Sequence, residues 1–173
     1  MIAGQPEIFL GLGANLGNRA ANLRMALRYL TPLAAVTAVS SLYETAPVGV
    51  AEQPPYYNAV CRLTTGLTPE GLLRYLKTIE FEIGRRPGPR WGPRPIDLDL
   101  LLYGDVVLES TDLVLPHPLV ARRAFVLVPL AELAPDLRHP LLGATVSELL
   151  PALAEDDLRG VEKLEAPGWE NQV

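Results

Sequence analysis

The order of strand-like and helix-like segments most constrains the fold of this chain. Apolar residues that alternate along the chain predict strands, and apolar residues at helical spacing predict helices. The predicted elements are a strand over 8–13, a helix with Leu23, Leu27 and Leu30 on one face that ends at Pro32, strands over 36–44 and 57–64, a helix over 69–83, and a strand over 96–103. This order is that of the ferredoxin-like βαββαβ fold of the α+β class, in which two helices cover one sheet face and leave the other for ligands.

The second predicted helix carries explicit signals at both ends. Thr68 is the expected N-cap, followed by Pro69 at the first helical position and Glu70 in the first turn. Gly84 is the expected C-terminal stop. Its buried stripe is expected to comprise Leu72, Leu76, Ile79 and Ile83.

The remaining third of the chain is less regular. Gly104-Asp105 predicts a tight turn into a strand over 106–108. Residues 121–134 have helical composition that Pro129 interrupts, and Thr145 with Glu148 predicts a capping box at the start of a last short helix. We find no internal repeat or domain boundary, so we expect one domain over 1–173, with a core over about 8–150 and an acidic, at best partly ordered tail over 151–173.

Charge is distributed unevenly along the chain. The net charge is −5, from 15 basic and 20 acidic residues, and residues 151–173 alone contain six acids against Arg159 and Lys163. Arginines cluster within 85–94 and at Arg122-Arg123. A nucleic-acid-binding protein is expected to have a basic surplus, which this chain lacks, so the local arginines indicate a small anionic ligand instead.

Composition and cysteine content limit the kind of protein further. The 173 residues, 49% of them hydrophobic, suffice for a substantial core. No apolar run approaches the roughly 18 residues of a membrane span, and the N-terminus lacks a secretion signal, so we expect a soluble cytoplasmic protein with no membrane partner. Cys61 is the single cysteine, which excludes an internal disulfide and a multi-cysteine metal site. Any metal must therefore bind to oxygen or imidazole, and Cys61 is predicted to be a small buried residue.

Asp97-Leu98-Asp99 is the sharpest chemical feature. Residues two apart in a strand point the same way, so both carboxylates are expected on one face, opposite Ile96, Leu98, Leu100 and Leu102. Two unit charges about 5 Å apart repel by roughly 3 kcal/mol at an effective dielectric constant near 20. Solvent, an ion pair with Arg94, or a divalent cation such as Mg²⁺ are the three ways to offset this repulsion.

The loop over 85–94 precedes this strand and contains four arginines, three prolines, two glycines and Trp91. Arginine presents a planar fork that matches phosphate oxygens. One interpretation is a phosphate-binding lid with Trp91 over the ligand. The alternative is a solvated turn with Trp91 packed on the core.

Weaker candidates lie elsewhere. His117, between two prolines, is either a phosphate ligand or a structural histidine. Tyr56, Asn58 and Phe125 could form an aromatic slot with an amide that recognises a heterocycle, although core packing is the alternative for the two aromatic residues. The glycines at 11, 13 and 17 do not have the spacing of a dinucleotide-binding or P-loop motif.

Short motifs are spread from about Ile8 to Leu150. They are Leu-Gly-x-Asn-Leu-Gly at 12–17, Ser-Ser-x-Tyr-x-Thr-x-Pro-x-Gly at 40–49, Gln-Pro-x-Tyr-x-Asn at 53–58, Glu80, Gly84-Arg85, Arg-Trp-Gly-Pro-Arg-x-x-Asp-Leu-Asp at 90–99, Pro-His-Pro at 116–118, and Arg-Ala-Phe-Val-Leu-x-Pro-Leu at 123–130. In these motifs the chain resembles the 6-hydroxymethyl-7,8-dihydropterin pyrophosphokinases of folate biosynthesis. One departure is Ala14, where a serine is common in the first loop of that family.

The resemblance implies a single catalytic domain, with ATP and the reduced pterin as substrates and AMP as a product. Asp97 and Asp99 would hold two Mg²⁺ ions, and Arg85, Arg94, His117 and Arg123 would neutralise phosphate charge. Asn58 and the backbone near Thr45 and Val48 would recognise the pterin edge, Tyr56 and Phe125 would stack on its ring, and Trp91 would close over the site. The role of Glu80 stays open, and a monomer is the default expectation.

Two other functions compete with this one. A kinase that acts on another small heterocyclic alcohol would release ADP. A ligand-binding module of the same fold would bind the ligands without turnover. The identity of the nucleotide product separates the three.

Overall fold

A six-stranded antiparallel sheet forms the centre of the computed structural model, which describes residues 4–47 and 52–171. The strand order is β5-β1-β4-β3-β8, with β2 also paired to β4. The strands are β1 (Ile8–Ala14), β2 (Ala34–Val39), β3 (Tyr43–Thr45), β4 (Tyr56–Thr65), β5 (Asp97–Tyr103) and β8 (Val161–Lys163). The helices are α1 (Arg19–Leu30), α2 (Pro69–Ile83), α3 (Ala124–Leu133), α4 (Val146–Leu149) and α5 (Glu155–Arg159). The predicted element order is therefore confirmed through β5, except that the strand predicted over 36–44 is two strands, β2 and β3.

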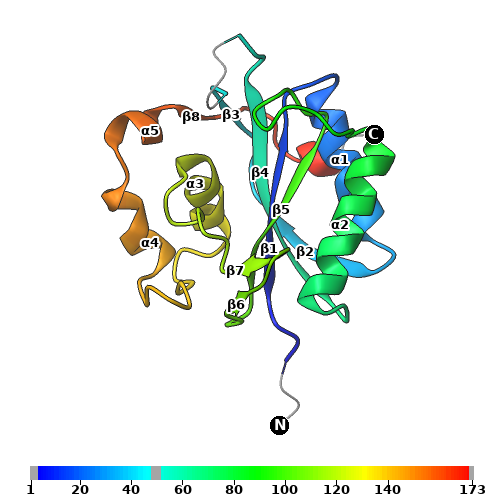
Figure 1. The fold of residues 1–173 in the computed structure, drawn as a ribbon. Coiled ribbons are helices and arrows are strands. Elements are labelled where there is room, and N and C mark those ends of the chain that lie inside the picture. Colours follow the sequence, from blue (N-terminus) through cyan, green and yellow to red (C-terminus); the bar gives the residue numbers. More distant parts are fainter. Residues whose placement is uncertain (1–3, 48–51, 172–173) are drawn as a thin grey trace.

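Helices cover both faces of the sheet (Figure 1). On one face, α1 and α2 bury the larger apolar cluster, which includes Leu10, Leu12, Leu72 and Leu76. On the other face, α3 packs on a smaller cluster around Phe9, Val60, Leu101, Leu127 and Leu130. The expected ligand face is thus only partly open. Within the described residues, no helix is both long and apolar enough to cross a membrane.

The predicted helix signals are confirmed by hydrogen bonds. The Thr68 side chain accepts a bond from Gly71 N at 3.1 Å, and Gly84 ends α2 at φ +116°, a left-handed conformation that suits glycine. Thr145 and Glu148 form the complete capping box of α4. Cys61 is fully buried, as predicted, and burial raises the pKa of its thiol to about 12.

The single strand predicted over 36–44 is two strands in the structure, β2 and β3, which both pair with β4. The chain leaves the ladder at Ser40, whose backbone N–H donates to Val60 O and whose hydroxyl accepts from Val60 N, both at 2.9 Å. These two bonds hold the link between β2 and β3 against β4, while β3 turns toward the sheet edge.

The prediction that Leu102 shares a face with Leu98 and Leu100 is wrong. The register between β1 and β5 shifts between Phe9 and Leu10, because Leu101 is an extra residue in β5. Leu102 therefore packs with the α3-side cluster, whereas Leu98 and Leu100 pack on the α1 and α2 side.

Two further boundaries differ from the prediction. The turn at Gly104 is present, but the next strand is β6 (Leu108–Glu109), which pairs with β7 (Val114–Leu115) in a separate sheet. Pro129 lies inside α3 and does not interrupt it. As the sixth residue of a ten-residue helix, it removes only one backbone donor that the helix would use.

The prediction of an at best partly ordered tail is wrong for residues up to 171. A 3₁₀ turn (Leu150–Ala152), α5, β8 and a second 3₁₀ turn (Trp169–Asn171) follow α4. β8 adds a strand to the sheet edge at β3, and Trp169 is only 2% exposed.

Candidate active site

A cavity of about 740 Å³ lies on the α3 side of the sheet. Strands β1, β3, β4 and β5, the 85–94 loop, the segment before α3, and α5 with β8 all contribute to its lining. The cavity brings together ten of the predicted site residues, namely Thr45, Tyr56, Asn58, Trp91, Arg94, Asp97, Asp99, His117, Arg123 and Phe125. Arg85 lies behind the lining, and Val48 falls outside the described residues.

Asp97 and Asp99 both face this cavity from β5, with Leu98 buried between them on the opposite face. Asp97 Oδ1 accepts a bond from Arg85 Nη1 at 2.7 Å, and its Oδ2 accepts one from Arg94 Nη1 at 3.2 Å. The ion pair with Arg94 that the sequence suggested therefore exists. This ion pair lies at the wall of the cavity and does not fill the cavity.

Asp97 is paired with two arginines, whereas Asp99 forms no ion pair among the described residues. Burial, and then the neighbouring charge of Asp97, raise the pKa of Asp99 to about 7. No third histidine, cysteine or acidic side chain joins the pair within the described residues. Two carboxylates, with water and phosphate oxygens for the remaining ligands, form a donor set that suits Mg²⁺.

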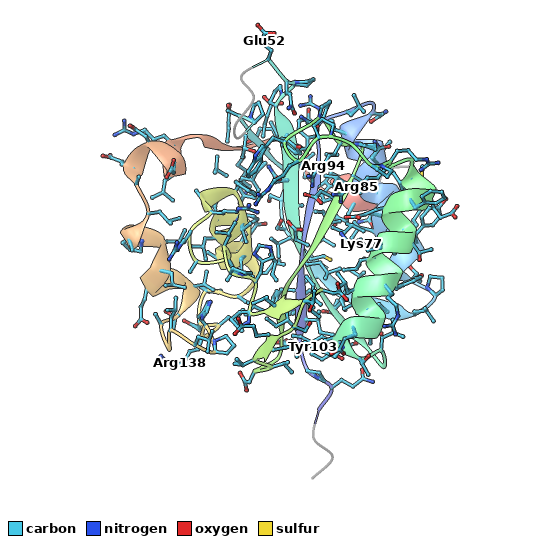
Figure 2. All side chains as sticks on the ribbon, in the orientation of Figure 1. Glu52, Lys77, Arg85, Arg94, Tyr103 and Arg138 are labelled. Carbon is cyan, nitrogen blue, oxygen red and sulfur yellow. The ribbon has the colours of Figure 1, made fainter. Side chains whose placement is uncertain are left out.

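Glu80 explains why Arg85 does not line the cavity. Its side chain is 3% exposed, and its Oε1 accepts bonds from Arg85 Nη1 at 2.6 Å and from Leu98 N at 2.8 Å. Glu80 on α2 thus fixes both Arg85 and the start of β5. Figure 2 shows Arg85 and Arg94 close together at that end of β5.

The 85–94 loop is held by the backbone of Arg94. Its N–H donates to Asn15 Oδ1 at 2.8 Å, and its carbonyl accepts from Asn15 N at 3.0 Å. The Asn15 side chain also donates to Gln53 Oε1 at 3.0 Å. Trp91 lines the cavity and is 47% exposed, so the alternative of a tryptophan packed on the core is wrong.

A second part of the cavity is less charged. Asn58 is 6% exposed, and its Nδ2 donates to Thr45 Oγ1 at 2.6 Å. Tyr56 and Phe125 are half-buried and line the cavity, with the Arg123 guanidinium 5.5 Å from the Phe125 ring centroid. A planar heterocycle of this size would meet aromatic surfaces and a fixed amide here.

His117 has one ring nitrogen already engaged, because its Nδ1 accepts a bond from Leu119 N at 3.1 Å. The proton of the neutral ring is then on Nε2, which is a donor. Burial, and then the charge of Arg123, lower the pKa of His117, which favours this neutral form.

The sequence prediction missed the floor of the cavity, which is formed by Gly11 and Gly13 of β1. These residues lie opposite Asp99 and Asp97 on β5, and Gly13 also lies opposite Asn58 on β4. A Cβ added to Gly13 would lie 3.1 Å from Asn58 Oδ1. Glycines at alternate strand positions are the signal of a face without side chains. Asp156, Asp157 and Val161 also line the cavity, although the sequence predicted no site role for them, whereas the lining residues Arg90 and Arg122 belong to the arginine clusters predicted to meet an anionic ligand.

Comparisons with known proteins show which family the chain is similar to. Residues 9–135 match the family model of 7,8-dihydro-6-hydroxymethylpterin-pyrophosphokinase (HPPK). The chain is 47% identical over 159 residues to the 2-amino-4-hydroxy-6-hydroxymethyldihydropteridine pyrophosphokinase of Methylorubrum extorquens, with 91% of this chain and 98% of that protein covered. It is 43% identical over 160 residues to the protein of the same name from Pseudomonas aeruginosa, with 91% and 96% covered.

The fold is similar to a crystal structure of HPPK-DHPS from Plasmodium falciparum, with a TM-score of 0.70 at 17% sequence identity. The alignment covers 87% of this chain and 46% of that one. The likeness supports the α+β ferredoxin-like fold that the sequence predicted.

Proposed function

The chain belongs to the 7,8-dihydro-6-hydroxymethylpterin-pyrophosphokinase family, which transfers pyrophosphate from ATP to 6-hydroxymethyl-7,8-dihydropterin in folate synthesis, and we propose that this reaction takes place in the cavity on the α3 side of the sheet. One observation carries the proposal. A single cavity combines two carboxylates, several arginines and an aromatic slot with a buried amide.

At the charged end, Asp97 and Asp99 would hold two Mg²⁺ ions, which when bound would neutralise the triphosphate. Arg94 and Arg123 supply positive charge beside the phosphates, and His117 supplies its Nε2–H as a donor. Arg85 is held between Glu80 and Asp97, so we assign it to orienting the Asp97 carboxylate.

At the less charged end, Asn58 and the backbone near Thr45 would recognise the polar edge of the pterin, and Tyr56 and Phe125 would stack on its ring. The contact predicted for Val48 remains part of this proposal. Trp91 would close over the bound substrates with the 85–94 loop.

The reaction requires placement more than covalent participation by the protein. The pterin hydroxyl gives up its proton to solvent and its oxygen forms a bond to the β-phosphorus, as the bond between that phosphorus and the α,β-bridging oxygen breaks and AMP leaves. Positioned charge that acts on the transferring group is the main source of rate enhancement in such reactions. The arginines and aspartates around the cavity are of the residue types that this role needs.

We also propose that the enzyme acts as a monomer in the cytoplasm, where ATP is available. One protomer supplies all the residues that the proposal uses. Size-exclusion chromatography with light scattering at micromolar concentration is expected to give the mass of one chain.

The test of the proposed function is to incubate the protein with ATP, Mg²⁺ and 6-hydroxymethyl-7,8-dihydropterin and to resolve the nucleotides. We expect one AMP for each pterin converted. ADP would indicate a simple kinase, and ligand binding without nucleotide turnover would indicate a binding module. Either result would contradict the proposal.

Gly13→Ala is expected to weaken pterin binding. The added Cβ would lie 3.1 Å from Asn58 Oδ1 and would displace the amide from its bond to Thr45. We expect the KM for the pterin to rise about tenfold, or about 1.4 kcal/mol, with the KM for ATP within about twofold. Gly66→Ala is the matched control, because a Cβ there meets nothing within 4 Å. An unchanged KM for the pterin would contradict a pterin site over Gly13.

A further inference from the structure

We propose that the C-terminal arm, residues 155–169, forms the outer wall of the pterin end of the site and sets its affinity for the pterin. The arm lies beyond residues 9–135, which match the family model, and it was expected to be a poorly ordered tail. This inference rests on the proposed function, because it assumes that the pterin lies between Asn58 and Phe125.

The arm is fixed to the fold from β8 onward. β8 pairs with β3, with Val161 opposite Thr45 and Lys163 opposite Tyr43, and Leu164 N donates to Leu42 O at 2.9 Å. Beyond β8 the arm passes around the edge of the sheet from the α3 side to the α1 side (Figure 1).

Trp169 anchors the far end of the arm. It is buried in the α1-side cluster, and its Nε1 donates to Ser40 O at 2.9 Å. Arg24 of α1 donates to the Trp169 carbonyl at 3.4 Å. Full burial of a large aromatic side chain stabilises this docking by several times the thermal energy. The arm is therefore a fixed wall.

The part of the arm between α5 and β8 borders the cavity. Four arm residues, Asp156, Asp157, Gly160 and Val161, line the same cavity as Asn58 and Phe125. Thr45, which accepts the bond from Asn58, is paired with Val161 itself. The arm thus contacts the proposed pterin pocket and also pairs the outer edge of β3, a strand of only three residues that would otherwise end the sheet.

The charge of the arm favours the pterin over the triphosphate as its neighbour. Two of the four lining residues are exposed aspartates, of which Asp156 lies 3.6 Å from Arg159 and Asp157 has no ion pair among the described residues, whereas the arginines that line the cavity come from the 85–94 loop and from Arg122-Arg123. An uncharged ring system can lie against such a wall, whereas a triphosphate is repelled by it. We therefore expect changes in the arm to affect pterin binding more than ATP binding.

Val161→Ala tests the inference in the full-length protein. Loss of two methyl groups from the wall is expected to raise the KM for the pterin about 3- to 10-fold, with kcat and the KM for ATP within about twofold. Val107→Ala is the matched control, since Val107 is 55% exposed and does not line the cavity.

Trp169→Phe provides a second variant that keeps most of the buried volume and removes the bond to Ser40. It is expected to raise the KM for the pterin in the same direction, with the folded state verified by its thermal unfolding transition. Equal rises in both KM values, or no rise in the Val161→Ala variant, would overturn the inference.

Asn58→Ala distinguishes failure of the inference about the arm from failure of the proposed function. If Asn58→Ala raises the KM for the pterin and Val161→Ala does not, the inference about the arm fails and the pterin site stands. If neither substitution changes it, the proposed location of the pterin fails as well.

Discussion

Asp97→Asn and Asp99→Asn, made separately, are each expected to reduce AMP formation below detection at saturating ATP, Mg²⁺ and pterin. Both carboxylates line the same cavity and lie on adjacent outward positions of β5. Each substitution removes one of the two negative charges that the proposal assigns to Mg²⁺ binding. The neutral amide is a much weaker ligand for a hard cation.

The two variants are expected to differ in stability. Asp97 is paired with Arg85 and Arg94 in a partly exposed network, so its loss is expected to lower the thermal midpoint slightly. Asp99 is a carboxylate that burial and the charge of Asp97 disfavour, so its loss is expected to leave the midpoint unchanged or raised. Both variants are therefore expected to lose activity, but they are expected to differ in thermal stability.

Asp105→Asn controls for the chemical change, because Asp105 is exposed in the turn after β5 and does not line the cavity. It is expected to retain the parent rate. Near-parent AMP formation by either site variant would contradict the assignment of the carboxylate pair. Calorimetric titration of Mg²⁺ into each variant in the presence of an ATP analogue would show whether metal binding is lost together with turnover.

The features that the sequence predicted correctly are determined by short stretches of chain. The alternation of Asp97 and Asp99 with Leu98 follows from the two-residue period of a strand, and the ends of α2 follow from Thr68 and Gly84. Each needs only residues within a few positions of one another. Local chemistry was enough to predict them.

The features that were missed depend on partners far along the chain. The extra residue Leu101 arises where β5 pairs with β1, and no pattern within β5 marks it. β8 is only three residues long and becomes a strand because β3 offers it an edge. Trp169 is buried by contacts that include Ser40, 129 residues away in sequence.

Within the site, the contacts of Arg85 likewise depend on residues outside its own segment. Its type and its place in the arginine-rich loop favoured a direct contact with phosphate. The structure instead pairs it with Glu80 and Asp97 at 2.6 and 2.7 Å, because the buried Glu80 carboxylate needs a positive partner. Glu80 also pairs with Lys77, three residues earlier in α2, at 3.3 Å, but its bonds from Arg85 and Leu98 N connect α2 to the loop and to β5 and form only in the folded protein.

Arg94→Ala is expected to lower kcat about 100- to 1000-fold, which corresponds to about 2.7–4 kcal/mol, the loss measured when one positioned electrostatic donor is removed from an active site. The guanidinium donates to Asp97 Oδ2 at 3.2 Å and to Arg90 O at 2.6 Å, so it is held at the wall of the cavity before substrates bind. Such a group stabilises the charge that develops on the transferring phosphates without first having to reorganise.

The substitution keeps the contacts of Arg94 with Asn15, which use only backbone atoms of Arg94, and removes one side-chain bond within the loop, to Arg90 O. Arg86→Ala is the matched control from the same loop, since Arg86 is exposed, does not line the cavity, and donates only to the carbonyls of Phe81 and Arg85. It is expected to keep kcat within about twofold. Single-turnover kinetics at saturating ATP separate the chemical step from binding. A change confined to the KM for ATP would mean that Arg94 stabilises the bound nucleotide and its transition state equally, and its catalytic assignment would then be wrong.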